Sequence, residues 1–191
     1  MGATLTAGDL RKGIKLEIDG EPYMVTDFEF SKPGKGQALY RCRLKNMITG
    51  SQFDRTYRSG DKFIAADLEE QQMQFLYHDG KRYHFMNTSS YDQLELTEDQ
   101  VGDATNYLID NQLVDMLLFQ GRPIGISLPN FVNLRAVRAD PWLKGDTAAG
   151  GTKPITLETG FVIQGPLFIE EGEVLKIDTR TGTYVERVKS A

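Results

Sequence analysis

The chain has 191 residues, of which 40% are hydrophobic and 26% are charged, and this composition excludes a wholly disordered protein. It has no apolar run long enough to cross a membrane and no secretory signal pattern at its N-terminus, so we expect a cytoplasmic protein with no membrane partner. The single cysteine, Cys42, excludes an internal disulfide, and the two histidines, His78 and His84, have no cysteine partners at ligand spacing, so we expect no metal site.

The net charge of −5 is distributed unevenly along the chain. Residues 1–65 carry a net charge of +3, residues 66–128 carry −8, and residues 129–191 carry none. The basic excess is concentrated in one stretch that contains no acidic residue. Its members are Lys32, Lys35, Arg41, Arg43 and Lys45. A solvated strand face and a surface that contacts phosphates explain this stretch equally well.

Alternation of apolar and polar residues predicts strands throughout the first part of the chain. The predicted strands cover residues 14–18, 23–30, 39–48 and 53–57. They indicate a small barrel of four or five strands. Because the alternation lapses around residues 59–61, we place the first domain at residues 1–65.

The second part combines hairpins with one short helix. Residues 73–77 and 83–86 form a predicted hairpin, and residues 113–119 and 124–128 form another. Between them, Thr97 to Gln100 has the pattern of a helix start, which residues 104–108 continue. One helix among five strands is typical of an OB-type barrel, which we assign to residues 66–128.

The third part begins with a predicted strand at residues 131–137 and continues into a long polar stretch at residues 140–152. Further strands are predicted at the segments 161–163, 167–169, 174–177 and 184–188. We therefore assign a second OB-type barrel to residues 129–191. The predicted fold class is therefore all-β, with three small barrel domains.

The loop from Ser31 to Ala38 separates two of these strands. Pro33 and Gly34 predict a type II turn, in which Gly34 would take a positive φ. Gly36 frees the other side of Lys35, which is then presented at the tip of the loop. On turn chemistry alone, a hairpin tip with a solubilising lysine is the simpler interpretation.

No motif supplies the convergent groups that an enzyme needs, and we predict no catalytic residue. The sequence around Lys35 lacks the spacing of a phosphate-binding P-loop. An exposed lysine also lacks the desolvation that would activate it as a nucleophile. Cys42 alternates with Tyr40 and Leu44 and is predicted to be a buried strand residue.

The chain resembles bacterial translation elongation factor P from end to end. The segments that carry this resemblance are Lys32–Ala38, Gly20–Tyr23, His84–Asn87, Pro129–Val132, Gly145–Thr147, Lys153–Gly160, Pro166–Phe168 and Gly172–Val174. Three positions depart from the family pattern. Ile155 stands where alanine is common, Gly165 where a branched aliphatic residue is common, and Trp142 where glycine is common, which leaves the local packing and the shape of that loop open.

The resemblance implies an SH3-like or KOW-like N-terminal barrel followed by two OB-fold domains, arranged as an L-shaped body that imitates transfer RNA. It implies binding to the ribosome between the exit and peptidyl-tRNA sites and relief of stalling at consecutive prolines. Lys35, extended by a post-translational group such as β-lysine, would position the CCA end of the peptidyl-tRNA. No other cofactor is expected.

The resemblance also assigns contacts to particular residues. Those expected against the peptidyl-tRNA are Lys32, Pro33, Gly34, Gly36 and Gln37 in the loop, with Arg41, Arg43 and Lys45 along the tRNA backbone. Those expected near the exit-site codon and the anticodon arm are Gly145, Asp146, Thr147, Tyr184 and Arg187. The implied partners are the ribosome, prolyl peptidyl-tRNA, messenger RNA near the exit site and a lysine-modifying enzyme, with the protein itself a monomer.

Alternatives remain open at this stage. A general RNA-binding β-barrel protein would use the loop only as a hairpin, and a paralogue of the factor would share its fold without its role. An enzyme that uses Lys35 as an imine-forming amine is a more distant alternative.

Overall fold

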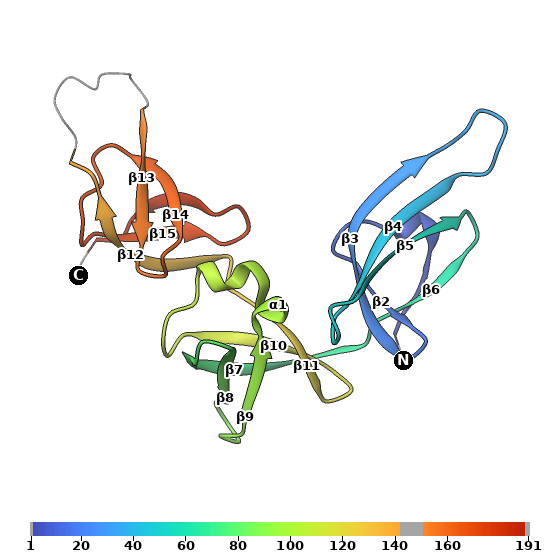
Figure 1. The fold of residues 1–191 in the computed structure, drawn as a ribbon, viewed down its shortest axis with the longest axis horizontal. Helices are drawn as coiled ribbons and strands as arrows, with labels where there is room; N and C mark the ends of the chain where they lie inside the picture. Colours follow the sequence, from blue (N-terminus) through green and yellow to red (C-terminus); the bar gives the residue numbers. More distant parts are fainter. Residues whose placement is uncertain (1, 142–150, 190–191) are drawn as a thin grey trace. The chain divides into compact units, whose positions relative to one another are not determined.

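The computed structural model describes residues 2–141 and 151–189, and Figure 1 traces their fold. The described residues form three antiparallel, curled sheets with little helix. By compactness the chain divides into two units, residues 1–71 with 116–125, and residues 72–115 with 126–191. The prediction of an all-β protein is confirmed.

The first sheet has six strands in the order β1-β6-β2-β3-β4-β5. Their bounds are β1 Thr4–Thr6, β2 Lys15–Ile18, β3 Glu21–Ser31, β4 Leu39–Asn46, β5 Gln52–Arg58 and β6 Lys62–Ala65. The expectation of four or five strands was wrong, because the short β1 and β6 pair with each other, Thr4 opposite Ile64. Segments of three and four residues are too short to show a period in the sequence.

The second sheet has the order β11-β10-β7-β8-β9. Its strands are β7 Leu68–His78, β8 Arg82–Asn87, β9 Gln93–Thr97, β10 Leu113–Phe119 and β11 Arg122–Ser127. The predicted helix start is confirmed: the Thr97 side chain accepts from the backbone of Gln100, whose side chain accepts from the backbone of Thr97. Helix α1 (Glu98–Val101) ends at Gly102, which has a φ of +59°, and a 3-10 turn, η2 (Gly102–Asn106), follows.

The third sheet has the order β14-β13-β12-β15-β16. Its strands are β12 Phe131–Ala139, β13 Thr152–Leu157, β14 Val162–Pro166, β15 Val174–Asp178 and β16 Thr183–Arg187. Two expectations fail here. Strand β13 was not predicted because Pro154 interrupts its pattern, and residues 167–169 form a turn rather than a strand, with the Ile169 N–H donating to the Pro166 carbonyl at 3.2 Å.

Each end of the chain has a core of its own. The first core gathers Leu16, Val25, Cys42 and Leu44, all at 0% exposure. Cys42 is a buried strand residue as predicted, and burial raises the pKa of its thiol. The third core contains buried residues of β12, β13 and β15. It also contains Tyr107, the residue that follows η2. The Thr159 hydroxyl also donates to the Asn106 carbonyl at 2.7 Å, so the η2 segment is packed onto the third sheet.

Candidate functional site

Strands β3 and β4 form a hairpin that carries the lysine loop at its end (Figure 1). The pairing beyond the bulge is symmetric about Lys35: Ser31 lies opposite Leu39, and Phe30 lies opposite Tyr40. Strand β5 supports this hairpin to its last pair, with Arg58 opposite Leu39. Lys35 is thus at the geometric apex of a three-stranded arm.

The turn at the apex differs from the predicted one. The Gly36 N–H donates to the Pro33 carbonyl at 3.2 Å, so Pro33 is the first residue of the turn and Lys35 the third. Gly34 has no positive φ, which rules out the type II turn that we expected around Pro33 and Gly34. The sequence could not decide this point, because Pro-Gly fits more than one turn register.

The glycines beside Lys35 are not required by packing within the chain. A Cβ placed on Gly34 would meet nothing within 4 Å, and one on Gly36 would make only ordinary contact with Pro33 Cγ at 3.4 Å. Lys32, Gln37 and Lys35 are all exposed. The loop therefore offers bare backbone and two ammonium groups to solvent, which permits close approach by a partner.

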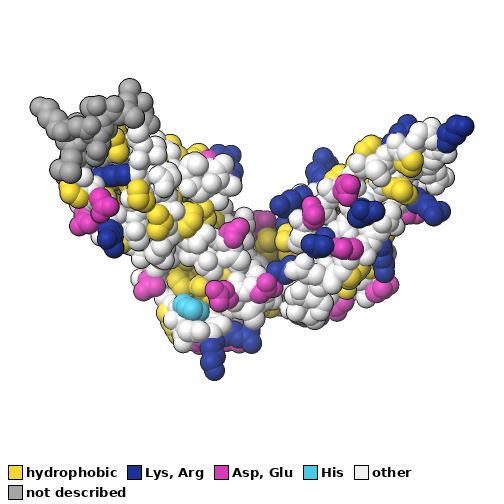
Figure 2. Space-filling model, turned by 45° about the horizontal axis from the view of Figure 1, so that its top comes forward, with side chains coloured by type: hydrophobic (Ala, Val, Ile, Leu, Met, Phe, Trp, Pro, Cys, Tyr) yellow, Lys and Arg dark blue, Asp and Glu magenta, His cyan; other side chains and the backbone are white. Residues whose placement is uncertain are grey.

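The basic strand β4 turns its arginines to one face of the arm. Figure 2 shows lysine and arginine side chains over this region with acidic side chains among them. Arg41 Nη1 lies 3.4 Å from Glu29 Oε2, and Arg43 Nε lies 2.9 Å from Asp54 Oδ1. The hydrogen bonds from Arg43 lower the pKa of the Asp54 carboxyl. Lys45, also on β4, lies opposite Gln52 of β5.

These ion pairs correct the impression that the basic stretch faces no acid. The acids come from the neighbouring strands β3 and β5 rather than from the stretch itself. The pairing with Glu29 could have been predicted from the sequence. If Lys35 is the apex of the hairpin, residues at equal distances before and after it lie opposite each other. Glu29 and Arg41 are each six residues from Lys35 and therefore form a pair. Asp54 required the register of a third strand, which the sequence does not fix.

The opposite face of the arm is aromatic. Phe28 and Phe30 from β3 meet the ring of Tyr40 from β4, with centroid distances of 6.3 and 5.1 Å. Tyr57 from β5 lies opposite Tyr40 and packs edge-on against Phe63 at 4.6 Å. Sequence reasoning treated these residues only as strand formers.

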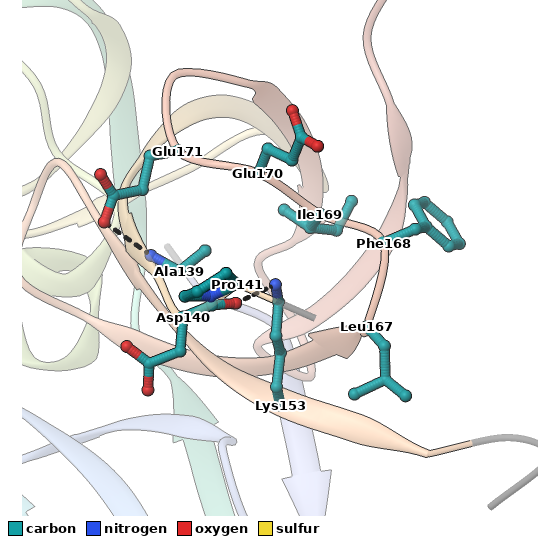
Figure 3. A pocket seen from close by; sticks show the side chains of 9 residues that line it. All are labelled: Ala139, Asp140, Pro141, Lys153, Leu167, Phe168, Ile169, Glu170 and Glu171. Atoms are coloured by element: carbon teal, nitrogen blue, oxygen red, sulfur yellow. Dashed lines mark hydrogen bonds between the residues drawn. The ribbon is translucent and has the colours of Figure 1, made fainter. Parts of the chain in front are cut away.

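The predicted contacts at Gly145, Asp146 and Thr147, and Trp142 with them, lie outside the described residues. The chain on either side of them lines a pocket of about 500 Å³ (Figure 3). In it the buried ammonium of Lys153, on β13, donates to the carbonyl of Asp140, and Glu171 Oε1 accepts from the backbone of Ala139 at 3.3 Å. The first bond fastens the end of β12 to the start of β13, and the second fastens it to the segment between β14 and β15.

The two remaining predicted residues lie on β16 and differ in exposure. Tyr184 is half-buried and packs against the third core. Arg187 is exposed, and its Nη1 lies 2.9 Å from Glu173 Oε1 while its guanidinium covers the ring of Phe168 at 4.9 Å. Arg187 is therefore the more exposed of the two.

Within residues 2–141 and 151–189, no group of three or more histidine, cysteine or acidic side chains is placed to hold a metal ion. In the same residues, no helix has the length and apolar character needed to span a membrane.

The fold of the described residues also occurs in a solved structure of another protein. A solved structure described as "Eukaryotic translation initiation factor 5A from Methanococcus jannaschii" matches 65% of the chain and 92% of its own length, with a TM-score of 0.50 and 23% identity, and this likeness concerns the fold alone. Three family descriptions match in chain order. They are the elongation factor P KOW-like domain at residues 6–63, the elongation factor P OB domain at residues 68–126 and the elongation factor P C-terminal domain at residues 132–187.

Full-length relatives agree with these matches. The chain is 61% identical to elongation factor P of Syntrophus aciditrophicus, over 96% of this chain and 98% of that protein. It is 62% identical to elongation factor P of Desulforapulum autotrophicum, over 95% and 97% respectively. The chain belongs to the elongation factor P family, and it is a translation elongation factor rather than an enzyme.

Proposed function

We propose that the protein binds the ribosome between the exit and peptidyl-tRNA sites and stimulates peptide-bond formation at consecutive prolines, with Lys35 positioning the CCA end of the peptidyl-tRNA. The observation that carries this proposal is the placement of Lys35 at the apex of a supported arm, in a register symmetric about it. The glycines beside it leave the backbone open to a closely packed partner.

The chemistry asked of the arm is positional. Proline restricts the geometry of the reacting groups because its ring fixes φ. A cation held beside the ribose and phosphates of the acceptor end would confine that end to arrangements in which the reacting atoms are close. No proton has to be transferred by the factor. A covalent β-lysyl extension of Lys35, added by a modifying enzyme, would lengthen its reach and carry further donors.

Other predicted contacts belong to the same proposal. Arg41, Arg43 and Lys45 would follow the tRNA backbone, and Arg187 would face the anticodon arm. For Arg41 and Arg43, binding to phosphate means exchanging Glu29 and Asp54 for the new partner. Both pairs are exposed, so this exchange costs little. Messenger RNA near the exit site would contact the segment that holds Gly145 to Thr147.

The test is a purified translation system with a message that encodes consecutive prolines. Lys35→Ala should leave the melting temperature unchanged and abolish rescue. Lys12→Ala, which removes an exposed lysine of the same domain that has no assigned contact, should retain rescue. Full rescue by Lys35→Ala would sink the proposal. Intact mass of the protein from its native host, with the increment localised to Lys35, tests the extension.

A general RNA-binding role is the second candidate, favoured by the cationic face of β4. It predicts that the isolated protein binds free RNA with a log–log salt slope of several units, about 0.9 for each phosphate contacted. No binding to free RNA would remove it. The wild-type protein can also be tested for rescue of polyproline synthesis with and without its modification. If both forms fail, the protein is a paralogue that lacks the proposed activity.

A further inference from the structure

On the aromatic face of the arm, the exposure of the side chains increases from the first core to the end of the arm. Phe63 is 9% exposed and belongs to the core, Tyr57 and Tyr40 are half-buried against it, and Phe30 is 52% exposed. The rings lie on neighbouring strands at paired positions, Phe30 opposite Tyr40 and Tyr40 opposite Tyr57. The rings of Phe30 and Tyr40 are in contact at 5.1 Å, and those of Tyr57 and Phe63 at 4.6 Å. Tyr40 and Tyr57 are cross-strand neighbours on the same face, so these residues form an aromatic ladder across the arm.

At this level the arm is held by the backbone pairing of β3, β4 and β5, and the ladder adds side-chain packing on one face. The other face at the same level carries exposed ion pairs such as Arg41 with Glu29, whose side chains are each 68% exposed. Exposed pairs of this kind contribute little to rigidity. Beyond the last strand pair, Ser31 with Leu39, the loop has no ladder hydrogen bonds of its own. The side-chain packing that helps to fix the direction of the arm therefore lies on its aromatic face.

A small tilt at the base has a large effect at the tip. Phe30 and Lys35 are five residues apart, which is roughly 15 Å of extended strand and loop. A tilt of about 10° at Tyr40 would displace the Lys35 backbone by about 3 Å. Displacements of about 1 Å can cost roughly a hundredfold in a reaction that depends on positioning.

We propose that Tyr40 is a positioning residue for Lys35, and that Phe30 completes its action. The Tyr40 ring contacts the rings of Phe28 and Phe30 on β3. Tyr40 is also the cross-strand partner of the core-anchored Tyr57, and so it transmits the fixed orientation of the first core to the end of the arm. Phe30 covers the outer side of Tyr40 and extends the ladder to the residue before the last strand pair. This inference rests on the proposed role of Lys35.

The test uses the full chain and three variants of the ladder. Phe30→Ala removes an exposed ring that contributes nothing to the first core and should leave the melting temperature within a few degrees of wild type. Tyr40→Leu removes the central ring, and Tyr40→Phe, the conservative control, retains it. Tyr91→Ala, which removes a 70% exposed ring from another region, is the control for loss of surface aromatics.

Two measurements separate positioning from folding and from binding. Amide order parameters of residues 34–38 should fall in Phe30→Ala and Tyr40→Leu and stay at wild-type values in Tyr40→Phe and Tyr91→Ala. In polyproline synthesis, the maximal rate should fall about tenfold or more in the first two variants, while the half-saturating concentration of the factor changes less than about twofold.

Three outcomes overturn the proposal. Unchanged order parameters in Tyr40→Leu would show that the ladder does not stiffen the arm. An unchanged maximal rate would show that stiffness is not needed. A raised half-saturating concentration with an unchanged maximal rate in Phe30→Ala would make Phe30 a docking contact. If Lys35→Ala retains full rescue, the proposed function fails instead, and the order parameters still decide whether the ladder stiffens the arm.

Discussion

The side chain of Ile155 occupies the space that a Cβ atom on Gly165 would need. Ile155, on β13, is fully buried, and its Cδ1 atom would overlap with a Cβ placed on the buried Gly165 of β14. The strands pair so that Lys153 lies opposite Gly165, with Ile155 one step along the same face. These are two of the three positions at which the sequence departs from the family pattern. The larger side chain at position 155 fills the space left by the missing side chain at position 165.

This packing predicts that substitutions at positions 155 and 165 have coupled effects on stability, which a double-mutant cycle measures. Gly165→Val alone should destabilise the protein by about 1–3 kcal/mol through overpacking, and Ile155→Ala alone by about 2–5 kcal/mol through a cavity. Together they should cost less than the sum, because each supplies the volume change that the other needs. Urea unfolding of the four proteins measures the coupling. Pairing Gly165→Val with the distant Leu16→Ala is the control, and additivity in the first pair would contradict the predicted coupling.

The ion pair between Arg43 and Asp54 predicts how the arm responds to loss of the acid. Asp54→Asn should free Arg43 for phosphate, tighten binding to ribosomes and steepen the salt slope by up to about 0.9. Arg43→Gln should weaken binding and flatten the slope by a similar amount. Binding measured between low and moderate salt tests both variants. Identical slopes in wild type and both variants would show that Arg43 does not contact phosphate.

The hairpin turn at Asp79 predicts a dependence of stability on pH. A hydrogen bond with the His84 ring at 2.8 Å, and the N–H groups of Arg82 and Lys81, hold the pKa of the Asp79 carboxyl well below its usual range. A lowered folded pKa contributes stability that is present above the unfolded value of about 3.9 and is lost as the pH falls through the folded value.

Asp79→Asn should therefore narrow the difference in melting temperature between pH 7 and pH 2.5. The exposed Asp110→Asn is the control, and it should leave that difference as in wild type. An equal narrowing in both variants would mean that the Asp79 turn is not the source.

The contact between Tyr107 and Gly182 predicts a sensitive position where the η2 segment meets the third sheet. Gly182 has a φ of +70°, and a Cβ on it would lie 3.0 Å from the Tyr107 hydroxyl. Gly182→Ala should cost about 1–2 kcal/mol from the backbone conformation alone. Gly172→Ala, with a φ of +90° and no atom near its Cβ, isolates the backbone cost. If Gly182→Ala loses more unfolding free energy than Gly172→Ala, the difference measures the steric contact with Tyr107. Equal losses would show that Tyr107 moves aside at no energetic cost.

The all-β class and the candidate lysine can be predicted from the amino-acid sequence. Alternation places apolar residues on one face of each strand, and Pro and Gly mark the turns, so most of the longer strands and the apex at Lys35 were predictable. Strands β1 and β6 were too short to show a period, and β13 was hidden by Pro154. These signals are local, and a local pattern carries no information on which strands become neighbours.

The folded structure sets the surroundings of each predicted residue. It paired Arg43 with Asp54 across two strands, turned Tyr184 toward the third core while Arg187 stayed exposed, and replaced the expected turn at Gly34 with one that begins at Pro33. It also joined Phe30, Tyr40 and Tyr57 into one ladder and matched Ile155 to Gly165. Each of these relationships depends on the register between strands, which is set by the packing of whole sheets and not by the order of residues along one strand.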